Sequence, residues 1–163
     1  MTTKSVSTSK FEAQNLGRAD TQGVEVIPVL RVLPGLTLSG SFTFLDFATK
    51  DSRLLRRPTE QGTVRVTYQR SVLRGTDDLL TFNVNLDVIG DRDDIDPLRG
   101  FRTNPMYART DVAVSYSFPV RFLPFSRLTV YSKIQNLFDR HYQEVLGFCS
   151  PPLNYLAGIR ITF

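Results

Sequence analysis

Hydrophobic and polar residues alternate strictly along the segment from residue 80 to residue 88. The apolar positions are Leu80, Phe82, Val84, Leu86 and Val88, and the residues between them are Thr81, Asn83, Asn85 and Asp87. An extended chain places successive side chains on opposite faces, so this segment predicts a β-strand with one apolar face and one polar face. Helical periodicity is hard to find anywhere in the sequence.

The same alternation recurs in other segments, and together they predict about seven strands. The further predicted strands lie near residues 36–44, 63–69, 111–118, 128–135 and 155–163, and a less regular one lies near Gly23–Val32. Pro28 interrupts that last segment because proline has no N–H group to donate to a ladder. The predicted strands have roughly 9–13 residues, which exceeds the about 5–6 residues usual in soluble domains and matches the about 9–11 residues that cross a bilayer at a tilt.

The polar face of the predicted strands carries charged residues, which include Arg65, Asp87, Lys133 and Arg160. A face this polar does not suit a packed core, but it suits a water-filled lumen, and the opposite face suits lipid. The connections agree with this interpretation. Leu33-Pro34-Gly35 is a tight turn, whereas the connections at residues 46–57, 90–105 and 139–152 are longer and more polar. Short turns at one end and long loops at the other are typical of outer-membrane barrels.

The predicted fold is therefore all-β, an antiparallel transmembrane β-barrel segment. Seven strands leave two open edges, and lipid does not tolerate open edges. We therefore expect this chain to form part of a larger barrel. The alternative is a soluble β-sandwich or small closed β-barrel that acts as a binding module, in which the apolar face would pack in a dry core.

Composition narrows the possible functions. The 163 residues carry a net charge of +4, spread along the chain, so we expect no nucleic-acid partner. The single cysteine, Cys149, excludes an intrachain disulfide, and the single histidine, His141, excludes a paired-histidine zinc site. No stretch approaches the about 20 apolar residues of a membrane helix, and the N-terminus has no apolar signal-peptide core. No nucleophile–base set or phosphate-binding loop is legible, so we expect no enzyme, no catalytic residue and no cofactor.

Four acidic residues cluster in one long connection: Asp91, Asp93, Asp94 and Asp96. Carboxylate oxygens suit calcium, so these residues are a weak calcium candidate. The glycine and distal glutamate of an EF-hand loop are missing. The alternative is a solvated loop whose acids pair with Arg92 and Arg99.

Other residues could serve in binding, each with an ordinary structural alternative. His141 and Tyr142 could touch a ligand at a barrel mouth or lie at a membrane interface. Cys149 has no basic pair to lower its pKa and is expected to be an incidental thiol. Arg53, Arg56 and Arg57 could bind lipid phosphates or could merely keep a loop in water. Aromatic residues that could form interfacial girdles are Phe42, Phe44, Tyr68, Tyr116 and Tyr155.

Three blocks of this sequence resemble the TonB-dependent outer-membrane receptors, which import vitamin B12, iron-siderophores and similar nutrients. The blocks are Asn15–Glu25, with its Gly-Val-Glu strand; Gly40–Asp46 followed by Leu54–Pro58; and Gln135–Glu144, with its Asn-Leu-Phe-Asp turn. The resemblance implies that residues 11–163 form the C-terminal part of such a barrel, with residues 1–10 as a disordered or strand-end N-terminus. Receptors of this family have about 22 strands and an N-terminal plug, and neither a plug nor a TonB-contacting segment is visible here.

The resemblance also implies a function and partners. We expect a barrel portion for uptake of a siderophore–iron complex or cobalamin, integral to the outer membrane of a Gram-negative bacterium and not competent for transport alone. TonB would act only through the missing plug region. The terminal aromatic with apolar alternate positions resembles the signal read by the barrel-insertion machinery, carried by Tyr155, Ala157, Ile159, Ile161 and Phe163. An amphipathic last strand can pair with an exposed sheet edge.

Overall fold

A computed structural model describes residues 19–49, 54–73, 76–96, 98–120 and 126–163 of the chain. The predicted N-terminal segment 1–10, and the start of the segment predicted from residue 11, lie outside these residues. The strands are β1 (Ala19–Val26), β2 (Val29–Leu33), β3 (Leu36–Thr49), β4 (Glu60–Arg70), β5 (Leu79–Ile89), β6 (Arg92–Asp96), β7 (Gly100–Asn104), β8 (Tyr107–Pro119), β9 (Arg127–Gln135) and β10 (Asn154–Thr162). The described part of the chain contains no helix long and apolar enough to cross a membrane.

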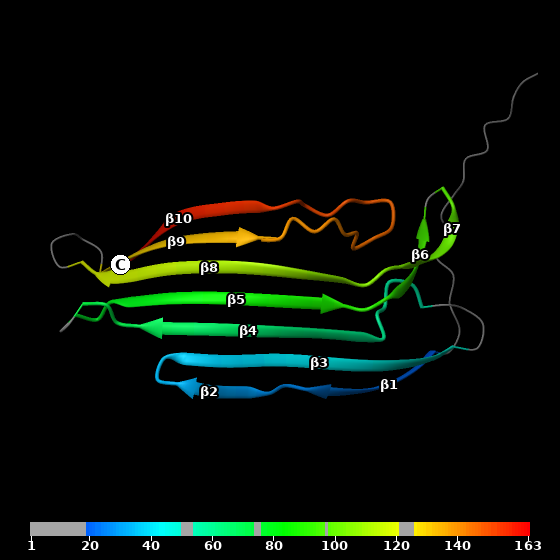
Figure 1. Cartoon of the computed structure of the whole chain (residues 1–163), viewed down its shortest axis with the longest axis horizontal. Coiled ribbons are helices and arrows are strands. Elements are labelled where there is room, and N and C mark those ends of the chain that lie inside the picture. Colours follow the sequence, from blue (N-terminus) through cyan, green and yellow to red (C-terminus); the bar gives the residue numbers. More distant parts are fainter. Residues whose placement is uncertain (1–18, 50–53, 74–75, 97, 121–125) are drawn as a thin grey trace, which may run out of the picture.

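Eight of these strands form one antiparallel sheet, in the order β1-β3-β4-β5-β8-β9-β10, with β2 also paired to β3. Figure 1 shows β1 and β2 following one another along the same edge of β3, so the sheet is seven strands wide. The predictions of about seven strands and of an antiparallel sheet are confirmed.

Pro28 divides the first predicted strand into two. The ladder of β1 ends at Val26 and that of β2 begins at Val29. The carbonyl of Pro28 still accepts a hydrogen bond of 3.0 Å from the Gly40 N–H group. The break therefore follows from the missing proline donor, and the chain keeps its course along the edge of the sheet.

The register of the strands gathers the predicted apolar and polar positions on two separate faces. Val84 of β5 pairs with Val66 of β4 and Val112 of β8 on the apolar face. Asp87 of the same strand pairs with Arg109 on the polar face. Among the described residues no hydrophobic side chain is buried, and nothing but the small β6–β7 sheet accompanies the main sheet. The described residues therefore do not form the sandwich with a dry core that the alternative interpretation predicts.

The connections at the two ends of the sheet differ in length, as predicted. Gly35 closes the short turn between β2 and β3 with a φ of 83°, a left-handed conformation that favours glycine, and its carbonyl accepts a hydrogen bond from Gln69. The chain ends beside these short turns (Figure 1), and the carbonyl of Thr162 accepts a bond from Ser126 N–H. The long connections lie together at the other end.

The long polar connection predicted at residues 90–105 contains two strands that the sequence did not predict. Most of this segment forms a β-hairpin, in which β6 pairs antiparallel with β7 and Ile95 lies opposite Phe101. Gly100, with a φ of 77°, begins the second strand. The alternation analysis did not predict β6 because this strand contains a run of acidic residues, and aspartate is depleted in β-strands.

A ring in β9 lies across a glycine in β10. Tyr131 and Gly158 are directly paired, and a methyl group built on Gly158 would lie 2.6 Å from the Cζ atom of the tyrosine. The guanidinium of Arg160 lies 5.9 Å from the centre of the same ring. Gly158 therefore provides the space in which the tyrosine ring packs against the last strand.

Candidate functional site

A row of paired polar and charged side chains crosses the polar face of the sheet from β4 to β9. We call it the polar wall, and its members are Thr63, Asp87, Arg109, Asp111 and Lys133. Arg109 lies between two carboxylates, with its Nη2 atom 3.1 Å from Asp87 and its Nε atom 3.4 Å from Asp111. Asp111 also lies 3.5 Å from the Lys133 Nζ atom, and Thr63 donates to Asp87 at 3.1 Å. The alternation of apolar and polar residues predicts that these side chains share one face of the sheet. The register between the strands then places them beside one another.

The polar wall continues toward the short-turn end as hydrogen-bonded pairs. Thr67 donates to Asn83 at 2.8 Å, and Arg65 donates to Asn85 at 3.3 Å. Together with the ionic row these side chains line a concave patch of about 610 Å³. Groups of both charges with hydroxyl and amide donors can bind a hydrated polar ligand or a polar protein surface.

At the other end of the sheet a buried carboxylate ties the long connections together. The side chain of Asp94 is fully buried and accepts hydrogen bonds of 2.8 Å from Arg56 Nε and from the N–H groups of Ile95 and Leu146. These donors come from the β3–β4 connection, from β6 itself and from the β9–β10 connection. One aspartate therefore joins three long connections.

Arg92 and Asn104 reinforce this junction from the base of the hairpin. Both donate to the carbonyls of Gln143 and Glu144, Arg92 at 2.7 and 3.0 Å and Asn104 at 3.0 and 3.4 Å. We call the set Arg56, Arg92, Asp94 and Asn104 the loop clamp. Because each buried polar group in it has a partner, the clamp holds the β6–β7 hairpin against the β9–β10 connection.

The hydrogen bonds of Asp94 also set its ionisation. Burial raises the pKa of Asp94, but the bonds from Arg56, Leu146 and Ile95 outweigh burial and hold the pKa below its ordinary value of 3.8. A carboxyl whose folded pKa is depressed stabilises the fold above its unfolded pKa, and this stabilisation is lost as pH falls through the folded value. The clamp is therefore intact at neutral and mildly acidic pH.

This linkage gives a prediction for Cys149, the single cysteine, which is exposed in the β9–β10 connection. A nitroxide on Cys149 should show the same mobility from pH 8 to pH 5 and should become more mobile only below about pH 4, where the unfolded carboxyl titrates. Electron paramagnetic resonance measures this directly. The Asp94→Asn variant should be mobile already at pH 7. A rise in mobility between pH 8 and 5 in the parent protein would contradict the assignment.

A second aspartate closes the β4–β5 connection at the short-turn end. Thr76 donates to Asp78 at 2.7 Å, and further bonds come from Val72 N–H, Ser71 and the Tyr116 hydroxyl. These bonds, that of Thr76 foremost, outweigh burial and hold the pKa of Asp78 well below its usual range. The turn is thereby tied to β8 through Tyr116.

The Asn-Leu-Phe-Asp turn is built around a buried asparagine. Asn136 has a left-handed backbone with a φ of 54°, which asparagine tolerates. Its side chain donates to the carbonyl of Arg140 at 3.0 Å and accepts from the N–H of the same residue at 2.9 Å. Its own N–H donates to Asp111 at 3.1 Å. The motif therefore attaches the β9–β10 connection to the polar wall.

The four aspartates predicted to bind calcium do not come together around one possible ion position. Asp94 belongs to the loop clamp, Asp91 accepts from Met106 N–H, and Asp96 accepts from the N–H groups of Leu98 and Arg99. Asp93 lies beside them in β6. In the described ranges no group of three or more histidine, cysteine or acidic side chains could hold a metal ion. The calcium site stays a prediction without a gathered ligand set.

The other predicted binding residues lie at the long-connection end. Tyr142 stacks on Tyr107 with ring centres 4.3 Å apart, and Arg92 lies 5.3 Å over the Tyr107 ring. His141 and Cys149 line a neighbouring pocket of about 370 Å³ with these tyrosines. Of the predicted arginines, Arg56 belongs to the clamp, Arg57 is exposed, and Arg53 lies outside the described residues.

The predicted girdle and assembly-signal residues share the apolar face. The pairing of the strands places Phe42, Phe44, Tyr68, Tyr116 and Tyr155 there, together with Ala157, Ile159 and Ile161. Tyr155 is 82% exposed and Phe163 is 86% exposed, and β10 is an edge strand of the sheet. Their roles in lipid contact and in barrel insertion stay predictions.

A family model described as "TonB dependent receptor-like, beta-barrel" matches residues 2–137. Among solved structures the chain is similar to P. aeruginosa FpvA bound to a heterologous pyoverdine, with a TM-score of 0.64 and 18% sequence identity. The match covers 86% of this chain and 19% of FpvA. At this identity the likeness concerns the fold, and the chain spans about a fifth of the length of its solved relative.

Proposed function

Because the chain belongs to the family of TonB-dependent receptor-like β-barrels, whose members are outer-membrane proteins, we propose that it forms part of the wall of an outer-membrane receptor for nutrient uptake. The observation that carries this proposal is a wide antiparallel sheet with one apolar face, one hydrogen-bonded polar face and no buried hydrophobic side chain among its described residues. Such a sheet is stable where lipid covers one face and water or a polar domain covers the other.

The proposed cargo is a siderophore–iron complex or cobalamin. FpvA, which shares the fold, was solved with a bound pyoverdine, and this supports a siderophore without identifying one. The loop clamp and the adjacent tyrosine stack would lie at the outer mouth, and the polar wall would face the lumen. In this arrangement the chain binds and passes a ligand and carries out no covalent chemistry.

The proposed partners follow from the same placement. Lipid would cover the apolar face, the barrel-insertion machinery would read the last strand, and TonB would act through a plug region outside this sequence. The open edges at β1–β2 and at β10 would pair with further strands of the complete barrel. We therefore propose that these 163 residues alone do not transport.

Cell fractionation tests the proposal. An antibody to residues 154–163 should detect the native product in the outer-membrane fraction of the source cells, as a band several times larger than 18.5 kDa. Deleting its gene should reduce uptake of one radiolabelled iron–siderophore or cobalamin, and the complete gene should restore uptake where the 163-residue chain does not. A soluble 18.5 kDa band would contradict the proposal.

A further inference from the structure

Two charged residues lie at the two ends of β4 on the apolar face of the sheet. Glu60 and Arg70 are the first and last residues of this strand, and both are exposed. Because side chains alternate along a strand, both lie on the same face as Val64. Among the described residues neither takes part in an ion pair. Both charges therefore need water. The positions between them on this face are uncharged: Gly62, Val64, Val66 and Tyr68.

The spacing of these two charges matches the thickness of the hydrocarbon layer that a barrel crosses. Glu60 and Arg70 are ten residues apart. A β-strand rises about 3.4 Å per residue, so the charges are separated by about 34 Å along the strand. Strands of transmembrane barrels tilt by about 35–45°, which projects this length onto about 24–28 Å along the membrane normal. The apolar band of such barrels is about 25 Å tall, so the segment between the charges has the length of one crossing.

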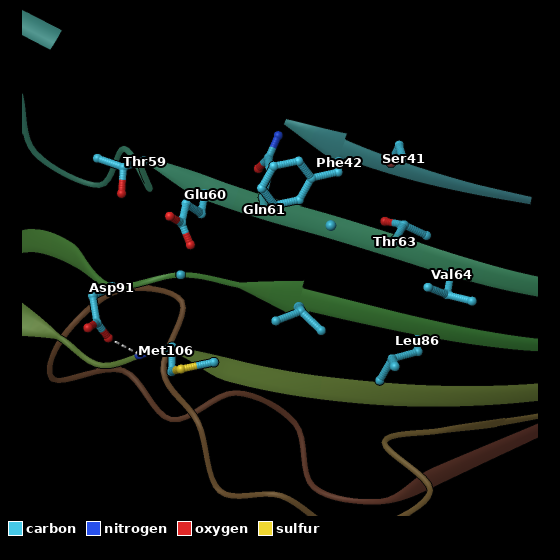
Figure 2. Close-up of a pocket in the computed structure, with 13 residues that line it drawn as sticks. Ser41, Phe42, Thr59, Glu60, Gln61, Thr63, Val64, Leu86, Asp91 and Met106 are labelled. Carbon is cyan, nitrogen blue, oxygen red and sulfur yellow. Dashed lines mark hydrogen bonds between the residues drawn. The ribbon is translucent and has the colours of Figure 1, made fainter. Parts of the chain in front are cut away.

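Near the long connections the apolar face becomes acidic. Phe44 of β3 pairs with Glu60, and Asp46, two residues farther along β3 on the same face, is exposed. Figure 2 shows the same transition in a hollow of about 570 Å³ on this face, with Glu60 and Asp91 near one end and Val64 at the other. Lipid hydrocarbon suits the side of Val64, and water suits the side of the carboxylates.

Beyond Phe44 the two faces of β3 exchange their character. After Phe44 the positions of β3 on the polar face are occupied by Leu45 and Phe47. Phe47 lines a pocket with Leu54 of the β3–β4 connection and Arg92 of β6, so other parts of the chain cover it. A strand within a bilayer has its apolar side toward lipid, and this part of β3 has it toward the protein. Before this point the residues of β3 on the polar face carry hydroxyl groups: Thr37, Ser39, Ser41 and Thr43.

A tyrosine marks the end of the apolar face near the short turns. Tyr116 of β8 pairs with Leu80 of β5, and Leu80 in turn pairs with Arg70. The Tyr116 hydroxyl donates a hydrogen bond of 3.0 Å to Asp78, in the connection that leads into β5. A ring with a polar tip is favourable where hydrocarbon meets water. The charge of Arg70 and the hydroxyl of Tyr116 therefore indicate the same boundary on neighbouring strands.

We propose that bilayer hydrocarbon covers the apolar face of β4 and its neighbouring strands from the level of Glu60 to the level of Arg70 and ends at these two residues. This inference rests on the proposed location in the outer membrane and adds the depth at which the sheet lies. The bilayer centre is then at the level of Val64 and Val66. The end of β3 beyond Phe44, the loop clamp and the β6–β7 hairpin lie in water outside the bilayer.

Spin labels along β4 test this depth. Single cysteines are introduced one at a time into the complete protein that carries this chain, together with Cys149→Ser, and the labelled protein is reconstituted in phospholipid vesicles. Electron paramagnetic resonance compares collisions of each label with oxygen, which concentrates in hydrocarbon, and with a water-soluble nickel complex. The positions on the apolar face are exposed or half-buried, so a label displaces no packed core. The variants are Glu60→Cys, Gly62→Cys, Val64→Cys, Val66→Cys, Tyr68→Cys and Arg70→Cys.

The ratio of oxygen to nickel collisions should be highest at Val64→Cys and Val66→Cys. It should fall at Glu60→Cys and Arg70→Cys to the value of a label in water. The matched controls are Thr63→Cys and Thr67→Cys, which lie on the polar face of the same strand and should show no such maximum. A displacement of the maximum by two residues corresponds to a shift of the sheet by about 5 Å along the membrane normal.

Three results would overturn the inference: a maximum displaced by two or more residues, a flat profile along the apolar face of β4, or the same maximum at the polar-face controls. A displaced or flat profile leaves the receptor proposal standing if the protein fractionates with the outer membrane. A soluble native product would instead remove the proposed function itself.

Discussion

Val84→Arg is expected to destabilise the membrane-inserted protein by about 2–4 kcal/mol, the cost of a guanidinium on the lipid face near the bilayer centre. Val84 lies on the central strand β5, between Val66 and Val112 on the same face. No carboxylate on that face is paired with these positions to compensate the charge. The free energy of unfolding of the protein that carries this chain, measured by urea titration in phospholipid vesicles with circular dichroism, reports the change.

The matched control places the same charge on the opposite face. Ser115 of β8 lies between Thr81 and Tyr131 on the polar face. Ser115→Arg can extend into water there, so its effect should stay within about 0.5 kcal/mol. If both variants cost the same, the two faces would not have different solvents, and the assignment of a lipid face would be wrong.

Asp94→Ala is expected to open the long connections, at a cost of about 2–4 kcal/mol in local stability. The substitution leaves the buried N–H groups of Ile95 and Leu146 without their acceptor. Arg56 contributes less, because its side chain is 51% exposed and can turn to water. Hydrogen exchange of the Leu146 amide measures the change and should accelerate by about 30-fold or more.

Asp96→Ala is the matched control, since it removes the same charge from the same hairpin. Asp96 accepts from Leu98 and Arg99 N–H groups in an exposed turn, so its loss should cost only about 0.5–1.5 kcal/mol and should leave Leu146 protected. Equal exchange of Leu146 in the two variants would show that Asp94 does not hold the connections together.

The sheet itself could be predicted from the sequence, because its strands are long and their alternation has a physical cause. Leu80 to Val88 is recognisable as one strand because its apolar and polar residues lie on two different faces of the sheet, and tertiary packing does not override that pattern. Pro28 likewise marked a real break in the ladder. The β6–β7 hairpin was missed because its three aspartates, Asp93, Asp94 and Asp96, resemble a solvated loop when their partners are unknown.

The loop clamp could not be predicted for a related reason. Asp94 and Leu146 are 52 residues apart, and Arg92 contacts backbone carbonyls that any residue would supply. Nothing in the local sequence distinguishes Asp94, which is fully buried, from Asp93 beside it. Asn136 was different, since it lay in a motif already singled out. The structure explains that motif by a left-handed turn that asparagine stabilises.

The contact between Tyr131 and Gly158 bears on how the last strand avoids slippage. A slip of β10 by two residues would keep every apolar side chain on its face, so alternation alone cannot prevent it. It would, however, place Leu156 or Arg160 beneath the tyrosine ring, where only Gly158 leaves room. The steric contact between the Tyr131 ring and Gly158 therefore favours the observed register of β10. It makes the aligned pairing of the terminal strand the one with the fewest clashes.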